Sequence, residues 1–198
     1  MRKASVLVLC LYIVLPAAIA SAEEIVLDLD PAQTEIHFAL ADVLHTVHGA
    51  FSLKRGTIHF DPETAKAGGE VVVDVPSGAS GSRPRDRKMH KDVLESDHFP
   101  EAVFTPDRVD GHFAAEGISE LEVHGLFQIH GAAHDLTFHA HVETKGDHLT
   151  ATLRSELPYT EWGIKNPSTL FLRCSDKVVL DIQTTAKTRM HAVQESKH

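Results

Sequence analysis

Three histidines lie on the polar sides of two alternating segments in the C-terminal half of the chain. His124 lies in LEVHGLFQI, and His139 and His141 lie in LTFHAHVE. Imidazole nitrogens bind zinc or copper when two or more of them converge with a carboxylate. Both segments also carry a glutamate on the same side as the histidines. A metal site on the outer face of a hairpin is therefore one hypothesis for these residues.

The register of the hairpin decides whether these groups meet. If residues 131–134 form the loop, His124 lies opposite His141 and Glu122 lies opposite Glu143. Directly opposite side chains have Cβ atoms about 5 Å apart, which is close enough for a shared ion. However, exposed strand faces are polar in any case, and a shift of one residue in register would separate the pairs. Both interpretations remain open from the sequence.

Signatures of the common enzyme classes are missing from the sequence. It contains no GxSxG, HExxH, P-loop or GxGxxG motif. All 15 histidines follow residue 22, so the net charge depends strongly on pH between about pH 5 and 7. We therefore expect a non-enzymatic protein. The alternative to a ligand carrier is a metal-binding or pH-responsive barrel that uses its His-rich hairpin and has a solidly packed interior.

The elements that would position these residues are β-strands. Most of the chain alternates between apolar and polar residues, as in TEIHFAL and GEVVVDV, which is the period of half-buried strands. Turn signals such as Gly68-Gly69 and Asp110-Gly111 separate the runs. Eight or more antiparallel strands with one apolar face predict an all-β fold, a barrel or a sandwich. The Phe-rich faces fit a packed core and an apolar ligand equally well.

One stretch, SRPRDRKMHKDVLESDHFP, departs from this alternation. Pro84 is placed for a helix start, and Met89, Val93 and Leu94 follow at helical spacing. We predict a short helix over about residues 84–96 that lies across the barrel with these apolar residues facing inward. Acidic residues interleave with the basic ones, which favours a solvated outer face over a basic binding patch.

The N-terminal segment has the parts of a secretory signal peptide. Arg2 and Lys3 precede an uncharged apolar run, and ASA at residues 20–22 resembles a cleavage site. We predict that residues 1–22 are removed near Ala22 and that residues 23–198 form a single domain. The predicted location is periplasmic or secreted, without stable membrane insertion.

The net charge limits the classes of binding partner, and the cysteine count limits the disulfides that can form. After residue 22 the chain has 17 basic and 28 acidic residues, a formal charge of −11. Nucleic acids and anionic membrane surfaces both need a basic face, so this charge argues against them. Cys174 is the single cysteine after residue 22, which excludes an internal disulfide there and predicts a small packed residue. The oligomeric state stays open, and a dimer is possible.

Several short motifs occur in order along the chain. LDPAQTEIHF, VHGAF and GTIHFDP come first, an Arg-Asp pair and MHKDVLESDHFPEAVFTP follow, and VHGLFQIHGAAHDLTF and KVVLDI come last. Over residues 27–184 they resemble the YceI-like family of secreted or periplasmic lipid-binding proteins. The resemblance implies a closed antiparallel up-and-down barrel of about eight strands, lipocalin-like, with the helix over one opening. It also implies a pore that holds a long polyisoprenoid, such as an isoprenoid-quinone tail.

This resemblance favours a ligand tunnel over a packed core. The expected ligand is a small apolar lipid held by burial, at about 0.8 kcal/mol per CH₂. No cofactor is expected, and zinc or copper belongs only to the alternative with His124, His139 and His141. The residues expected to line the barrel and its rim are Phe38, Leu40, Phe51, Val73, Met89, Val93, Phe104, Val123, Phe127, Phe138, Leu153 and Trp162.

The stretch PYTEWGIKNPS gathers Tyr159, Trp162 and Asn166 after a predicted strand. Asn-Pro is a turn signal, so we expect a loop at one end of the barrel. Trp and Tyr combine an apolar body with a polar tip and suit a rim where the lining meets water. The alternative, which we favour, is a plug in which Trp162 seals one end and Asn166 satisfies the loop backbone.

Overall fold

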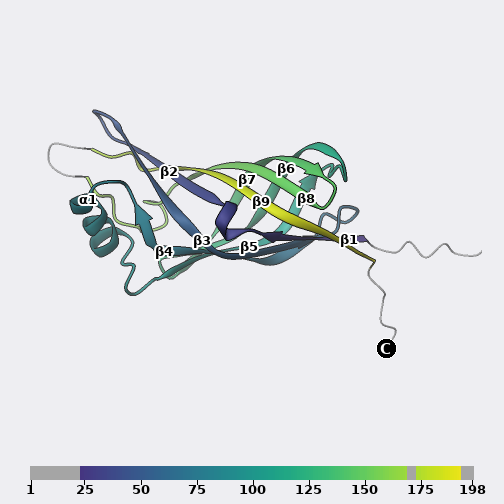
Figure 1. Cartoon of the computed structure of the whole chain (residues 1–198). Coiled ribbons are helices and arrows are strands. Elements are labelled where there is room, and N and C mark those ends of the chain that lie inside the picture. Colours follow the sequence, from purple (N-terminus) through teal and green to yellow (C-terminus); the bar gives the residue numbers. More distant parts are fainter. Residues whose placement is uncertain (1–22, 169–172, 193–198) are drawn as a thin grey trace, which may run out of the picture.

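A computed structural model of the chain describes residues 23–168 and 173–192. In this part, strands are wound into a barrel with one short helical segment at one end (Figure 1). The elements are β1 (Glu23–Leu29), η1 (Pro31–Gln33), β2 (Glu35–Ala41), β3 (Thr46–Phe60), β4 (Ala67–Ala79), α1 (Arg83–Lys88), η2 (Met89–Val93), β5 (Glu101–Gly111), β6 (Gly117–Ile129), β7 (Ala132–Lys145), β8 (His148–Leu157) and β9 (Val178–Ala192).

Every strand pairs antiparallel with its neighbours, and the sheet closes on itself. The order runs β3-β2-β9-β8-β7-β6-β5-β4, and a further pairing of β3 with β4 completes the circle. The extra strand β1 runs in the same direction as β2 and lies between the same two neighbours, β3 and β9. β1 and β2 therefore share one strand position, and the predicted closed barrel of about eight strands is confirmed.

The shared position is broken by η1. The Asp30 carboxylate caps this turn by accepting hydrogen bonds from the Ala32 amide (2.9 Å) and the Gln33 side chain (2.7 Å). Thr34 then donates its hydroxyl hydrogen to the Asp30 carbonyl (2.7 Å). Pro31 supports the turn because its ring presets φ and it has no N–H to satisfy. The local sequence DPAQT thus interrupts one long strand and lets each half pair separately.

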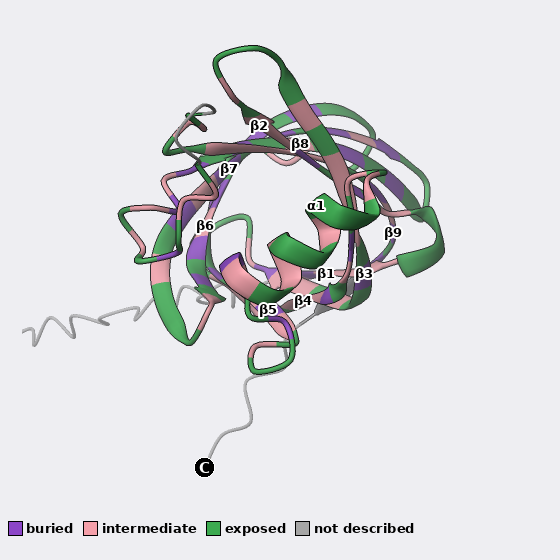
Figure 2. Ribbon diagram, turned by 90° about the vertical axis from the view of Figure 1, so that its left-hand side faces the viewer, coloured by how far each residue is buried: buried purple, intermediate pink, exposed green. Residues whose placement is uncertain are grey.

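Helix α1 and the π-helical turn η2 lie across one opening of the barrel (Figure 2). The helical segment runs from Arg83 to Val93, so it ends slightly before the predicted limit of residue 96. Its start is tied to the end of β4 at Ser80. The Asp86 carboxylate accepts hydrogen bonds from the Ser80 amide (2.8 Å) and hydroxyl, and the Arg85 guanidinium donates to the Ser80 carbonyl (2.8 Å).

The opposite end of the barrel is closed by aromatic packing. Phe60, at the end of β3, and Phe113, in the β5–β6 connection, contact each other edge to face with ring centroids 5.4 Å apart. Leu149 and Ala186 are almost fully buried near the same end. Some of the most deeply buried residues therefore lie at the end away from the helix.

The predicted register of the β6–β7 hairpin is wrong. Its turn is His130-Gly131, with φ angles of 51° and 81°, and pairing resumes at once with Ala132 opposite Ile129. Positive φ at both central residues is the geometry of a two-residue hairpin turn whose twist matches the strands. His130 stands where Asn or Gly is usual, so its residue type does not indicate a two-residue turn, and the expected loop over residues 131–134 was too long.

The new register changes the partners of the histidines. His124 lies opposite Thr137, His139 opposite Glu122, and His141 opposite Glu120. Two histidines no longer face each other. The shift is an even number of residues, so all three side chains still lie on the outer face of the barrel.

β5 and β6 approach each other unusually closely at Gly125. Its partner is Pro106, which is fully buried and lies beside a β-bulge between Pro106 and Arg108. A Cβ atom added at Gly125 would lie 2.3 Å from the Thr105 carbonyl oxygen. Proline inside a sheet is accommodated at bulges, and glycine where two backbones come close. The Pro-Gly pair therefore fixes the local spacing of the wall.

Replacing Gly125 with alanine should destabilise the barrel by about 1–3 kcal/mol, because the methyl group would overlap the β5 backbone. The measurement is the free energy of unfolding by urea titration. Gln128→Ala, at an exposed position on the same strand, is the control and should change stability little. Equal stability of Gly125→Ala and the wild type would contradict this account of the wall.

Candidate ligand-binding cavity

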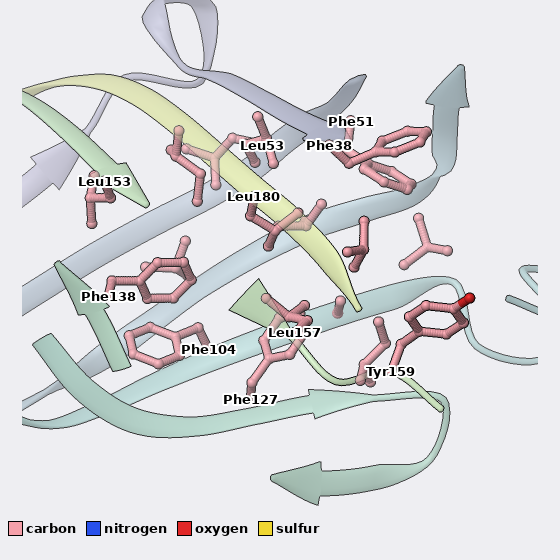
Figure 3. Close-up of a pocket in the computed structure, with 18 of the residues that line it drawn as sticks. Phe38, Phe51, Leu53, Phe104, Phe127, Phe138, Leu153, Leu157, Tyr159 and Leu180 are labelled. Carbon is pink, nitrogen blue, oxygen red and sulfur yellow. The ribbon is translucent and has the colours of Figure 1, made fainter. Parts of the chain in front are cut away.

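The barrel is hollow between the helix and the far aromatic pair. A cavity of about 610 Å³ extends from Met89 on the helical segment to Phe60 and Phe113 at the other end. Figure 3 shows side chains from several strands pointing into this shared space. Its volume lies within the range of about 300–1,000 Å³ that is usual for small-molecule sites. The interior of an eight-stranded barrel is either filled by side chains or holds one ligand, and here room for a ligand remains.

All twelve residues that the sequence predicted as lining contact the cavity. They come from seven strands, the helical segment and the loop that follows β8. They are Phe38, Leu40, Phe51, Val73, Met89, Val93, Phe104, Val123, Phe127, Phe138, Leu153 and Trp162.

Aromatic pairs shape the walls at two levels. Phe38 and Phe51, on paired strands β2 and β3, have ring centroids 5.4 Å apart near the helix end. Phe104 and Phe138 meet edge to face at 5.2 Å deeper in the barrel (Figure 3). Aromatic pairs favour tilted and edge-to-face geometries, so these contacts help to orient the rings within the apolar wall.

Polar groups are unevenly distributed along the cavity. The charged side chains that line it, Asp42, Arg85 and Lys88, lie at the helix end, with His45 beside Asp42. Deeper in, the Thr184 hydroxyl donates to the Thr34 hydroxyl (2.7 Å), which in turn donates to the Asp30 carbonyl. The deep part of the cavity is therefore suited to burying hydrocarbon, and the charged lining groups of the described residues lie at the entrance.

The stretch PYTEWGIKNPS lies at the helix end. Tyr159 and Ile164 are buried and pack with Val93 of η2. The Tyr159 hydroxyl donates to the Ser175 carbonyl (2.7 Å), and the Asn166 side-chain oxygen accepts from the Ser168 amide (2.9 Å). The stretch thus closes part of the entrance beside the helix. The Asn166 side chain forms a hydrogen bond with the backbone of its own loop.

Trp162 belongs to both the wall and the entrance. Its ring lines the cavity, lies 6.1 Å from the Phe127 ring and stacks on the His134 ring at 4.5 Å with an angle of 7°. This stack fixes the indole against the start of β7. A ligand in the cavity would therefore meet Trp162 at the helix end and not at the closed end.

Several residues besides the twelve expected ones also line the cavity. Leu180 and Ile182 alternate inward on β9, and Tyr159 and Ile164 complete the entrance. The alternation in KVVLDIQT contained the signal for the first two. Nothing in the sequence marked Ile164, because it lies in a loop whose course depends on the helix.

The structure gives no support to a metal site at His124, His139 and His141, because no group of three or more His, Cys, Asp or Glu side chains in the described part of the chain is arranged to hold an ion. Each histidine meets carboxylates of neighbouring strands. His124 Nε2 lies 3.1 Å from Asp110, and His139 Nδ1 lies 3.3 Å from Glu122. His141 contacts Glu120. Glu122 lies near both His124 (3.7 Å) and His139 (3.3 Å), whereas His141 pairs separately with Glu120.

The sequence matches the model of one protein family. The model of the YceI-like domain matches residues 27–186, most of the chain. The chain belongs to the YceI-like family. No curated protein matches this family member in sequence.

Solved structures share the fold of this YceI-like chain. Burkholderia cenocepacia BcnA is 20% identical with a TM-score of 0.67, and the match covers 81% of this chain and 100% of that one. A polyisoprenoid binding domain from Saccharophagus degradans, implicated in plant cell wall breakdown, is 13% identical with a TM-score of 0.64, covering 85% and 99%. The Campylobacter jejuni YCEI protein is 19% identical with a TM-score of 0.55, covering 77% and 88%.

None of the helices in residues 23–168 and 173–192 has the length and apolar character of a transmembrane segment.

Tyr159 should give the barrel a characteristic loss of stability at alkaline pH. Burial, with smaller effects of Cys174 and Asp176, raises the pKa of its hydroxyl from 10.0 to about 12. The unfolded chain ionises first, so the stabilisation by Tyr159 is complete below pH 10 and is lost as pH rises towards 12. The free energy of unfolding should therefore fall more steeply over this range in the wild type than in Tyr159→Phe.

The phenylalanine variant lacks the hydrogen bond to Ser175, so it should be less stable by about 1 kcal/mol at neutral pH. This loss of stability is the same throughout the pH range, so it lowers the whole stability profile of the variant without changing its slope. Parallel stability profiles of the two proteins between pH 10 and 12 would contradict the assignment.

Proposed function

We propose that this protein is a secreted or periplasmic, non-enzymatic carrier that holds a long apolar lipid inside the barrel. The proposed lipid is a polyisoprenoid or the tail of an isoprenoid quinone. The observation that carries the proposal is the cavity of about 610 Å³ with its apolar, aromatic-rich wall.

The depth of the cavity favours a long chain. Strand β6 has 13 residues, and strands rise about 3.3 Å per residue with a tilt of about 40° in barrels of this type. The wall therefore extends over roughly 30 Å along the barrel axis. A ligand that follows the cavity from the entrance to Phe113 must be elongated and mostly hydrocarbon.

The free energy of burying hydrocarbon also favours a long chain. Ten buried CH₂ equivalents would contribute about 8 kcal/mol before the cost of association is met. A short acyl chain leaves little net affinity after that cost, whereas several isoprene units leave a substantial surplus. The Saccharophagus degradans relative, a polyisoprenoid binding domain, supports this choice of ligand.

The arrangement of polar groups suggests an orientation. Arg85, Lys88 and Asp42 border the helix end, so a polar or anionic headgroup would remain there while the tail fills the barrel. The absence of enzyme motifs from the sequence supports a role in binding rather than catalysis. The signal-peptide-like residues 1–22 support a location outside the cytoplasm, where an apolar lipid needs a soluble carrier.

The direct test is extraction of the bound lipid. Protein purified from its native compartment is extracted with organic solvent, and the extract is analysed by mass spectrometry. We expect a polyisoprenoid or isoprenoid quinone in a stoichiometric amount. An extract without lipid from folded protein would overturn the proposal.

A pair of tryptophan substitutions on β8 locates the ligand. Leu153 is half-buried and lines the cavity, whereas its neighbour Thr152 is exposed on the outer wall. Leu153→Trp should fill the cavity and lower the extracted lipid at least tenfold, while Thr152→Trp should leave it unchanged. Circular dichroism checks that both variants fold. Equal lipid in the two variants would place the ligand outside the barrel.

A further inference from the structure

The β2–β3 hairpin ends in an exposed apolar tip. Val43 is 65% exposed and Leu44 is 76% exposed, the two most exposed large apolar residues in the described part of the chain. The Asp42 carboxylate accepts hydrogen bonds from the amides of Leu44 (2.8 Å) and His45 (2.9 Å), which fixes the turn. These bonds hold the pKa of Asp42 below its ordinary value. The turn therefore presents both apolar side chains to the outside.

A row of cations lies on the outer side of the helical segment. Arg83, Arg87 and Lys91 follow each other at spacings of four residues, and all three are exposed. Within the described ranges, none of the three lies within 4.0 Å of a carboxylate as an ion pair. We refer to Arg83, Arg87 and Lys91 as the basic row.

Two of the four acidic residues between Arg83 and Asp97, Asp86 and Glu95, are engaged elsewhere, and the other two are Asp92 and Asp97. Asp86 binds Ser80 and turns towards the end of β4. Glu95 faces His98 (4.0 Å) and His130 (3.7 Å), on the side of the β6–β7 turn. The basic row thus stands out on a chain whose formal charge after residue 22 is −11.

The apolar tip and the basic row lie at the same end of the barrel, around the cavity entrance. Figure 1 shows the β2–β3 hairpin and α1 projecting at one end, and Figure 2 shows them bordering the same opening. The lining of the cavity includes Asp42 and His45 from the hairpin and Pro84 and Lys88 from the helix.

We propose that this end of the barrel docks reversibly on an anionic phospholipid bilayer. Val43 and Leu44 enter the interface between headgroups and acyl chains, and the basic row contacts lipid phosphates. Apolar insertion combined with cations is the pattern of peripheral membrane binding, and two apolar residues with three cations give weak, reversible attachment. The cavity entrance then faces the bilayer, so an apolar chain can enter the barrel without crossing water.

This inference adds a docking surface to the proposed carrier function and can be tested separately from it. Binding is measured by co-sedimentation with vesicles that contain no isoprenoid, so the result reports docking alone. Lipid extraction reports the cargo alone. One can therefore fail while the other succeeds.

The probes are phosphatidylcholine vesicles and vesicles of phosphatidylcholine and phosphatidylglycerol in equal amounts. We expect the wild type to bind the anionic vesicles more tightly, and salt near 1 M, where the Debye length is about 3 Å, to weaken binding. Arg87→Gln with Lys91→Gln should weaken binding about 25-fold, or about fivefold per cation. Val43→Ser with Leu44→Ser should weaken it at least tenfold on both types of vesicle.

Matched controls come from the rest of the barrel. Ile118→Ser removes an apolar residue that is 62% exposed at the opposite end. Lys145→Gln with Arg154→Gln removes two exposed cations from β7 and β8. Both controls should bind vesicles like the wild type.

Three results would overturn the proposal. One is no binding of the wild type to either vesicle. Another is equal losses in the control and test variants. The third is that Val43→Ser with Leu44→Ser converts a dimer to a monomer by size exclusion without affecting vesicle binding, which would assign the tip to a second copy of the chain. Circular dichroism establishes that each variant is folded.

Discussion

Closure of the sheet is the constraint on which the other features depend. The pairing of β3 with β4 removes the last free edge, so every strand position has two hydrogen-bonded neighbours. A closed ring of eight positions has a fixed interior width, and its apolar side chains must either fill that space or leave room. Here they leave a continuous cavity. The chain has nine strands, but β1 and β2 both lie between β3 and β9 and share one position. The ring therefore still has eight positions.

Closure also gives each strand two different surroundings, the cavity on its inner face and solvent on its outer face. Side chains of one parity enter the cavity, and those of the other parity meet solvent. Phe138 therefore lines the interior while His139, the next residue, pairs with Glu122 outside. The histidines and carboxylates form local pairs along the outer wall, and such exposed pairs contribute little to stability. The His-rich hairpin is thus a consequence of a polar outer face.

The two ends of the barrel differ because different connections meet there. At one end, Phe60 and Phe113 pack together and close the cavity. At the other, α1, the β2–β3 hairpin and the Tyr159 loop surround an entrance. Charge follows the same asymmetry, since a chain that is acidic overall carries its basic row beside that entrance. Net charge alone argued against membrane surfaces, and only the placement of Arg87 and Lys91 beside an apolar tip suggests otherwise.

The sequence by itself determined the strands, the helix and the inward parity of the nine expected lining residues that lie on strands, because period-two alternation and the Pro84 helix start are local properties. It did not determine the β6–β7 register, since His130 adopts a left-handed turn that its residue type did not signal. It also left open whether the interior is filled, and which end Trp162 occupies. These depend on distances between strands remote in sequence. Only the closed tertiary structure sets those distances, so only it decided that the barrel is hollow and that Trp162 stands at its entrance.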